Sequence, residues 1–409
     1  MAADLKLTIN DRYSLITLIF FIPYIIFEIP ANIGIRKVGA RIWLPTACLC
    51  WGIAMIGMGF AKDWTVLLGL RFVIGLFEAV LFPGAAYLLA CWNIRSEVQT
   101  RLSFFYLLSA FASGFSAIIS YGFSLMAGRG GLAGWSWIFI MCGILTCIVA
   151  FIGYFLIVDF PDSPRARKFL SAEEALLIKT RIERDRGDSV HDPLTLRKIG
   201  QYFQNPLYWA YCTMFGGTTL ISYAFAYFLP LLLKGMGFST ANAQLLTAPP
   251  YGLALILGGI EGMLSDKFRT RSVFFLFNTG LNIIGCCLLG FTTPVALRYF
   301  GCFLCCAGAN ANVPIVVGWM HSCISGQSKR AFGSALVVAG GGIGGILAST
   351  TYMAKEAPTY KTGVYVTLGA QALIALIAIV LVAYFRMQNA KAQAGKINIQ
   401  GVPGFRYML

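Results

Sequence analysis

Long apolar runs separated by short polar segments dominate this chain, and the pattern predicts eleven membrane-spanning helices. The runs approach the ~20 residues that cross the hydrocarbon core of a bilayer. Backbone groups in that core must be satisfied within the segment, so we expect every run to be helical. The expected spans are residues 13–34, 43–61, 64–92, 99–126, 135–158, 205–233, 242–264, 272–291, 294–320, 331–353 and 362–386. Prolines inside them predict kinks at Pro30, Pro83, Pro230, Pro249–Pro250 and Pro314.

One long polar segment divides the spans into a group of five and a group of six. It covers residues 159–203 and contains Ser171-Ala172-Glu173-Glu174, a capping-box pattern that predicts a helix running to about Arg186. We therefore expect two helical bundles joined by a linker. The predicted divisions are a short polar N-terminus (1–12), an N-terminal bundle (13–158), the linker with an amphipathic helix (159–203), a C-terminal bundle (204–388) and a tail (389–409).

Composition and charge agree with a multi-pass membrane protein. Hydrophobic residues make up 58% of the chain and charged residues 12%, against roughly 25% charged residues in soluble domains. The net charge is +15, and most basic residues fall on one side of the predicted topology. Lys and Arg are concentrated in cytoplasmic loops, so that side, with the linker and the tail, faces the cytoplasm. The basic balance therefore does not indicate nucleic-acid binding.

A short basic motif follows corresponding spans of the two groups. The chain reads Gly262-Met263-Leu264-Ser265-Asp266-Lys267-Phe268-Arg269-Thr270-Arg271 after the seventh span and Asn32-Ile33-Gly34-Ile35-Arg36-Lys37-Val38-Gly39-Ala40-Arg41 after the first. The first stretch resembles the G-x-L-x-D-R-x-G-R-R loop of the major facilitator superfamily, and the second resembles its degenerate partner, with Arg36 in place of the aspartate. Basic residues at a helix end can simply anchor the protein, but repetition in both halves favours a transporter. The resemblance implies a major facilitator fold and a conformational latch formed by Asp266, Lys267, Arg269, Arg271, Arg36, Lys37 and Arg41.

Further motifs resemble one family within that superfamily. They are RFVIGLFEA at 71–79, GWSWIFIMCG from Gly134, DFPD at 159–162, AQLLTAPPY at 243–251 and PGFRY at 403–407. Their order and spacing resemble the anion:cation symporter family, in its fungal allantoate permease branch, over essentially the whole chain. The resemblance implies uptake of a small organic anion or vitamin, such as allantoate, nicotinate, pantothenate or biotin, usually with protons. One departure is Gly342, where many relatives have Asn.

Few charged residues lie within the predicted spans, and two of them are candidates for chemistry. Glu28 and Glu261 sit near cytoplasmic helix ends, where snorkelling or pairing with loops suffices, so we interpret both as structural. Arg71 and Glu78 are deeper, seven residues apart on one helix face and about 10 Å apart along the axis. They form either a buried ion pair that packs the bundle or an anion site beside a proton site. In the second interpretation Arg71 binds a substrate carboxylate, and burial favours the protonated form of Glu78.

Other features of the spans are weaker candidates. Polar residues at mid-span depth could bind substrate or hold helices together; they are Tyr121, Tyr223, Asn310 and Asn312. The run from Gly340 to Gly345 lies in an apolar span, which favours close helix packing over nucleotide binding. Cys302 and Cys305 form a C-x-x-C in a hydrophobic helix without a second pair or a nearby His, so we expect no metal site.

The function that we expect is proton-coupled symport of a small organic carboxylate or vitamin-like anion. We expect no enzyme activity and no cofactor other than the proton gradient as driving force. The expected partners are a small anionic substrate and the lipid bilayer, with no nucleic acid, and the expected form is a monomer in the plasma membrane. The alternatives are a sugar porter, because PDSPR at 161–165 resembles that family's motif, and a sensor or inactive product. A drug antiporter fits less well, because the fourth span lacks G-P-x-x-G-G.

The number of spans raises one more expectation. Eleven spans with a cytoplasmic C-terminus place the N-terminus outside, although Lys6 and Arg12 oppose its export. One additional helix before the first span would return the N-terminus to the cytoplasm and give each half six helices. We therefore expect this chain to lack the first helix of a twelve-helix transporter, and to insert and transport weakly.

Overall fold

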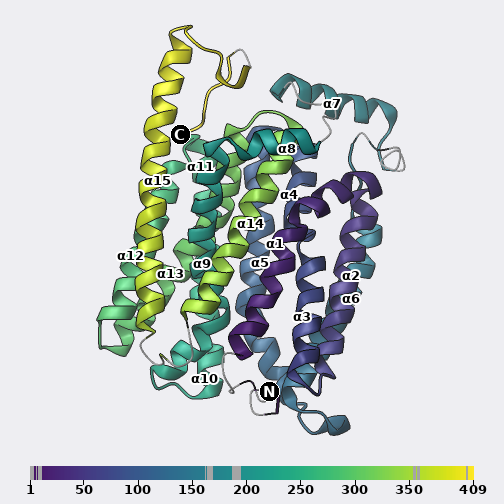
Figure 1. Cartoon of the computed structure of the whole chain (residues 1–409), viewed down its shortest axis with the longest axis vertical. Coiled ribbons are helices and arrows are strands. Elements are labelled where there is room, and N and C mark those ends of the chain that lie inside the picture. The colour runs from purple at the N-terminus through teal and green to yellow at the C-terminus, as the bar shows by residue number, and fades with distance from the viewer. Residues whose placement is uncertain are drawn as a thin grey trace.

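The structure is a computed structural model that describes residues 4–5, 7, 12–161, 163, 169–186, 195–352, 356, 360–401 and 404–409. All regular structure in these residues is helical, which confirms the expected all-α fold, and most helices stand side by side in one bundle (Figure 1). The helices are α1 (Arg12–Val38), α2 (Ala40–Gly59), α3 (Trp64–Glu78), α4 (Leu81–Trp92), α5 (Arg95–Ser124), η1 (Arg129–Gly131), α6 (Gly134–Leu156), α7 (Ala172–Arg186), α8 (Leu196–Phe203), α9 (Pro206–Gly235), α10 (Thr240–Leu245), α11 (Ala248–Phe268), α12 (Ser272–Phe291), α13 (Val295–Cys323), α14 (Gln327–Thr351), α15 (Lys361–Gln393) and η4 (Ile399–Gly401).

Ten helical stretches of the described chain are long and apolar enough to cross a membrane. They correspond to the predicted spans from the second to the eleventh. The predicted first span, 13–34, is the helix α1, which has 27 residues but whose apolar stretch, Leu15–Glu28, is shorter than a full span. Of the eleven expected spans, ten are therefore long and apolar enough to cross a membrane in the described residues, and the first is a helix with a shorter apolar part.

Prolines break two of the spans where the sequence predicted kinks. Pro83 lacks the N–H that would bond the carbonyl of Ala79, and its ring crowds that carbonyl; the helix accordingly divides into α3 and α4 at Ala79–Val80. Pro249 and Pro250 stand in the first turn of α11, directly after the short α10. The other prolines, such as Pro230 and Pro314, lie inside continuous helices.

The helices form an N-terminal half, α1–α6, and a C-terminal half, α9–α15. The halves meet where α1 packs against α14 and where α5 packs against α11 and α13. Glycines permit the closest approaches: a Cβ on Gly344 would lie 2.3 Å from the carbonyl oxygen of Gly216 on α9, and one on Gly342 would lie 2.6 Å from Cγ1 of Ile25 on α1. Close helix packing by the run from Gly340 to Gly345 is thus confirmed.

Within the part of the linker that the structure describes there are two helices, of which the sequence predicted one. The capping box is present: the backbone N–H of Glu174 donates to Ser171 Oγ at 3.2 Å, and the N–H of Ser171 donates to Glu174 Oε2 at 2.9 Å. It opens α7, which ends at Arg186 as expected. The second helix, α8, has eight residues, too few for a periodic pattern to reveal. Most of the PDSPR motif lies outside the described residues.

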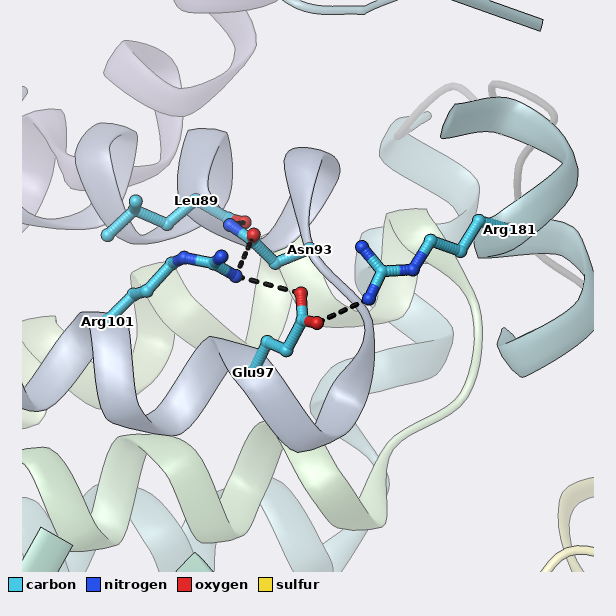
Figure 2. A network of polar contacts seen from close by, with 5 residues as sticks. All are labelled: Leu89, Asn93, Glu97, Arg101 and Arg181. Carbon is cyan, nitrogen blue, oxygen red and sulfur yellow. Dashed lines mark hydrogen bonds and ion pairs between the residues drawn. The ribbon is translucent and has the colours of Figure 1, made fainter. Parts of the chain in front are cut away.

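Polar contacts attach α7 to the bundle (Figure 2). Arg181 on α7 forms an ion pair with Glu97 in the first turn of α5. Glu97 also accepts a hydrogen bond from Arg101 Nη1 at 2.9 Å, and Arg101 donates in turn to Asn93. Asn93 closes the network by donating to the Leu89 carbonyl at 2.8 Å. The linker helix is therefore held at the end of α5 where the chain leaves α4.

The last residues of the chain fold back onto the C-terminal half. The helix α15 continues to Gln393, beyond the predicted end of its span at 386, so the first residues of the expected tail are helical. Further on, the Tyr407 ring stacks on Phe385 at 4.3 Å between centroids, and the Tyr407 N–H donates to Asn389 Oδ1 at 2.9 Å. Trp319 Nε1 donates to the Met408 carbonyl at 2.9 Å. Residues 404–409, which include most of the PGFRY motif, thus contact both α13 and α15.

Candidate functional site

Arg71 and Glu78 lie on α3, and both side chains are partly exposed. They influence each other electrostatically, but no ion pair between them occurs in the described part of the chain. Arg71 Nε is buried without a hydrogen-bond partner among the described residues. In a tight structural ion pair, the carboxylate of Glu78 would accept hydrogen bonds from the guanidinium of Arg71. The structure has no such bonds between these two residues. Glu78 is the last residue of α3 and stands immediately before the break that Pro83 imposes.

Tyrosines from several helices surround this pair. Tyr223 and Tyr227 on α9 stack with ring centroids 6.0 Å apart, and Tyr227 interacts electrostatically with both Arg71 and Glu78. Tyr24 on α1 is buried, and its hydroxyl lies within electrostatic range of Glu78, Glu28 and Tyr223. The candidates of the two halves therefore meet in one interior region, although the sequence pointed only to Tyr223 among these tyrosines.

The other predicted polar candidates lie in different surroundings. Asn312 faces α12: its Nδ2 donates to Thr279 Oγ1 at 3.2 Å and to the Phe275 carbonyl at 3.3 Å. Asn310 donates to the carbonyl of Cys306 one turn earlier at 2.8 Å. Tyr121 is partly exposed near the end of α5. Asn312 thus holds two helices of the C-terminal half together, the alternative role that the sequence left open.

The interpretation of Glu28 as a snorkelling or loop-paired residue is wrong. Glu28 is 0% exposed, and neither carboxylate oxygen has a hydrogen-bond partner among the described residues. Glu261 is also buried, at 3% exposed, but its Oε2 accepts a hydrogen bond from Asn278 Nδ2 at 2.5 Å. The helix α1 packs against α3 of its own half and against α14 of the other half, and the local sequence around Glu28 does not show these contacts.

The two repeated loops use different chemistry. In the loop after α11, Arg271 is 1% exposed and donates to Asp266 Oδ1 at 2.5 Å and to Ser265 Oγ at 2.8 Å. In the loop after α1, Arg36 Nε donates to the Tyr87 hydroxyl at 2.9 Å, and its guanidinium lies 4.0 Å from the centroid of the Phe160 ring. Arg36, Asp266 and Arg271 are therefore engaged with neighbouring groups in the two halves.

The remaining residues of these loops divide into exposed and bound ones. Lys37, Lys267 and Arg269 are exposed, and Arg269 ends α11 in a left-handed conformation with φ 51°. Arg41 Nε donates to the Tyr154 carbonyl at 2.9 Å. Lys267 and Arg269 are thus on the surface of the protein, whereas Arg271 of the same motif is buried in its ion pair with Asp266.

The cysteines and acids of the described residues form no group of three or more that could hold a metal ion. Cys302 and Cys305 are buried and free, and Cys305 Sγ lies 3.6 Å from Cys286 Sγ on α12.

Comparisons with known proteins agree on one family. Residues 1–349 match the sequence profile of the Major Facilitator Superfamily. The chain is 29% identical over 401 residues to the MFS-type transporter cnsO of Penicillium expansum, covering 95% of this chain and 77% of that protein. It is 25% identical over 397 residues to the high-affinity nicotinic acid transporter of Saccharomyces cerevisiae, covering 96% and 73%. The solved structure of the proton:xylose symporter XylE has a similar fold, with a TM-score of 0.73 at 15% identity over 93% of this chain and 87% of that one.

Proposed function

Because this chain belongs to the major facilitator superfamily, we propose that it is a proton-coupled symporter of a small organic carboxylate, working by alternating access between its two halves. The observation that carries the proposal is the pair Arg71 and Glu78, which lie within one membrane span, Trp64–Leu89, without forming an ion pair. A neutral substrate gives no reason to keep two costly charges in a membrane span. The yeast relative named for nicotinic acid fits a carboxylate substrate.

Arg71 supplies the anion site in this mechanism. Its guanidinium presents donors in a planar fork that matches a carboxylate, and the buried Nε has no partner among the described residues to compete for it. Tyr223 and Tyr227 are polar candidates near this pair for contacts to the rest of the substrate, and Asn310 is a candidate contact from α13. Tyr121 is a candidate contact from α5.

Glu78 supplies the proton site. Burial favours the protonated form of a carboxyl group, and the cation Arg71 on the same helix opposes this effect at Glu78. A substrate carboxylate on Arg71 neutralises that cation, so Glu78 then takes up a proton more readily. Substrate and proton therefore bind cooperatively, which is the thermodynamic requirement of symport. The proton gradient is the driving force, and no cofactor is required.

The loops with Asp266, Arg271 and Arg36 act as the latch in this proposal. Their contacts join the ends of α1 and α11 to neighbouring elements, and rocking of the halves requires these contacts to break and re-form. The working form is a monomer in the plasma membrane, with residues 159–203 on the cytoplasmic side.

Uptake of labelled organic acids, beginning with nicotinate, tests the proposal. Cells that lack their own permeases and express this chain should accumulate one such acid, and dissipating the proton gradient should abolish the accumulation. Arg71→Lys should raise the KM for that acid about 10- to 100-fold, because a point charge cannot replace two charge-assisted hydrogen bonds. Arg129→Lys, on the exposed η1, is the matched control and should transport normally.

Glu78→Gln separates coupling from binding. It should abolish proton-driven accumulation and retain part of the exchange of labelled for unlabelled substrate, whereas Glu173→Gln on α7 should leave both intact. Accumulation that persists in Glu78→Gln, or that survives loss of the proton gradient in the unmodified chain, would contradict the proposed coupling.

A further inference from the structure

Glu28 lies at the contact between the two halves of the molecule. On α1, the positions Phe21, Tyr24, Ile25 and Glu28 follow the three- and four-residue spacing of a single helix face. A Cβ on Gly345 of α14 would lie 2.2 Å from the Phe21 ring, and one on Gly342 would lie 2.6 Å from Ile25. The face that carries Glu28 is therefore the one that packs on α14, which we call the α1–α14 interface.

The interface continues beyond Glu28 on both sides. Tyr24 belongs to the same buried cluster as Val338 of α14, and Ala31 belongs to the same cluster as Ala331. These pairs lie one turn before and one turn after Glu28 on α1. A wholly buried carboxyl group is thus enclosed where the N-terminal half meets the C-terminal half.

The groups around Glu28 offer it no counter-charge. The titratable or charged residues described on its own helix and on the elements that pack against α1 are Arg12, Tyr13, Tyr24, Arg36 and Lys37 on α1, Arg41, Cys48 and Cys50 on α2, Arg71 and Glu78 on α3, Tyr87 and Cys91 on α4, and Lys329 and Arg330 on α14. Tyr223 of α9 also lies within electrostatic range. Among these described residues none forms an ion pair or a hydrogen bond with Glu28.

An ionised carboxylate in such a place would be far more costly than the neutral acid, because neither water nor a partner compensates its charge. The packing of α1 on α14 therefore requires a proton on Glu28. Glu78 differs in one respect, because the cation Arg71 stands seven residues before it on the same helix.

We propose that Glu28 is a second proton-binding carboxyl group, and that its protonation is what permits the α1–α14 interface to close. The proton enters when the halves separate and water reaches the carboxylate, and it leaves when they separate toward the other side of the membrane. This inference rests on the proposed alternating access, and it adds a proton whose binding is linked to the conformational change itself rather than to the charge of the substrate.

The first test detects the proton directly and needs no substrate. Infrared spectra of the purified chain at neutral pH should contain the carbonyl stretching band of a protonated carboxylic acid, and Glu28→Gln should remove it. Glu261→Gln is the matched control, because Glu261 is equally buried but lies within the C-terminal half and is bonded to Asn278. If Glu28→Gln removes no such band, Glu28 is ionised in the closed form and the proposal is wrong.

The second test measures the link between proton and interface. Hydrogen exchange of the amides of α1, corrected for the intrinsic effect of pH, should rise up to about tenfold per pH unit above the pH at which a water-exposed carboxyl group ionises, since opening then releases one proton. Glu28→Gln should abolish this dependence, while Glu28→Asp and Glu261→Gln should retain it. An unchanged pH dependence in Glu28→Gln would overturn the proposal.

Two further outcomes are informative. If Glu28→Gln does not fold, hydrogen exchange of the unmodified chain still tests the inference, because exchange of the α1 amides that does not depend on pH contradicts it. Failure of labelled carboxylate uptake would instead overturn the proposed function, and neither the infrared nor the exchange result depends on that uptake.

Discussion

Replacing Arg181 by glutamine removes the ion pair that ties α7 to α5 (Figure 2), and it tests how firmly the linker helix is held. The Arg181 side chain is 54% exposed and that of Glu97 is 30% exposed, so water screens the pair. Exposed ion pairs contribute ~0.2–1 kcal/mol. At the upper end of that range, losing the pair raises the fraction of molecules in which α7 is detached from the bundle roughly fivefold.

Hydrogen exchange of residues 172–186 in the purified chain measures this population. The helix has 15 residues, and isolated helices of about that length are marginal in water, so detachment exposes its amides. We expect Arg181→Gln to raise their exchange rate up to about fivefold. Arg184→Gln, on the same helix, removes an equal charge without breaking the pair and should have little effect.

The pH dependence has a definite sign. Hydrogen bonding from Arg101, opposed by partial burial and aided by Arg181, holds the pKa of Glu97 below its ordinary value of 4.5. A lowered pKa means that the stabilisation is complete above about pH 4.5 and is lost as the pH falls through the lower value in the folded chain. The difference between the unmodified chain and Arg181→Gln should therefore disappear in acid, and high salt should reduce it. Equal effects of Arg181→Gln and Arg184→Gln would refute the role assigned to the pair.

Three further variants test individual contacts by thermal unfolding in detergent. Gly342→Asn should cost about 1–3 kcal/mol, because the new Cβ would overlap Ile25, and adding Ile25→Ala should recover part of that loss. Asn312→Ala should lower stability by about 1 kcal/mol through its lost bonds to α12, with the KM for substrate unchanged; a raised KM would return Asn312 to the substrate site. Asp159→Ala should cost about 1–2 kcal/mol, because Asp159 Oδ1 accepts the N–H of Ala40 at the start of α2 at 3.0 Å; an unchanged melting temperature would contradict this capping role.

Much of the fold follows from signals that act within a few residues. The capping box at Ser171 fixes the start of α7 because both of its hydrogen bonds are local. Pro83 breaks its span because its ring and missing N–H act on Ala79, one turn away. The sequence did not reveal α8, which is too short to show a helical period and is placed by contacts such as that of Tyr202 with Ser328, at 2.9 Å.

The candidate site was predictable only in part, for a physical reason. Arg71 and Glu78 stand out because charges are rare inside apolar spans, and their seven-residue spacing places them on one face. Whether they form an ion pair depends on side-chain conformation, which spacing does not determine. The burial of Glu28 could not be anticipated, because it depends on α14, whose contact with α1 joins segments about 300 residues apart.

The two repeated loops show how one sequence pattern serves two structures. In the C-terminal half, Asp266 binds Arg271, so the loop ties α11 to the start of α12. In the N-terminal half, Arg36 occupies the place of the aspartate and cannot accept hydrogen bonds. Its guanidinium lies instead against the Phe160 ring, at 4.0 Å, and donates to Tyr87.

This difference changes which elements each loop controls. Phe160 follows Asp159, which accepts the N–H of Ala40 at the start of α2, and these two residues are the first of the linker. Arg36 therefore connects the end of α1 to α4 and to the point where the linker begins. In the other loop, the backbone N–H of Arg271 donates to the Leu409 carbonyl at 2.5 Å, so that loop is connected to the last residues of the chain. We therefore expect a movement of the end of α1 to affect the start of the linker, and a movement of the end of α11 to affect residues 404–409. The repeat preserves the position of a contact at the helix end, and the substitution of a cation for an acid redirects that contact to a different segment.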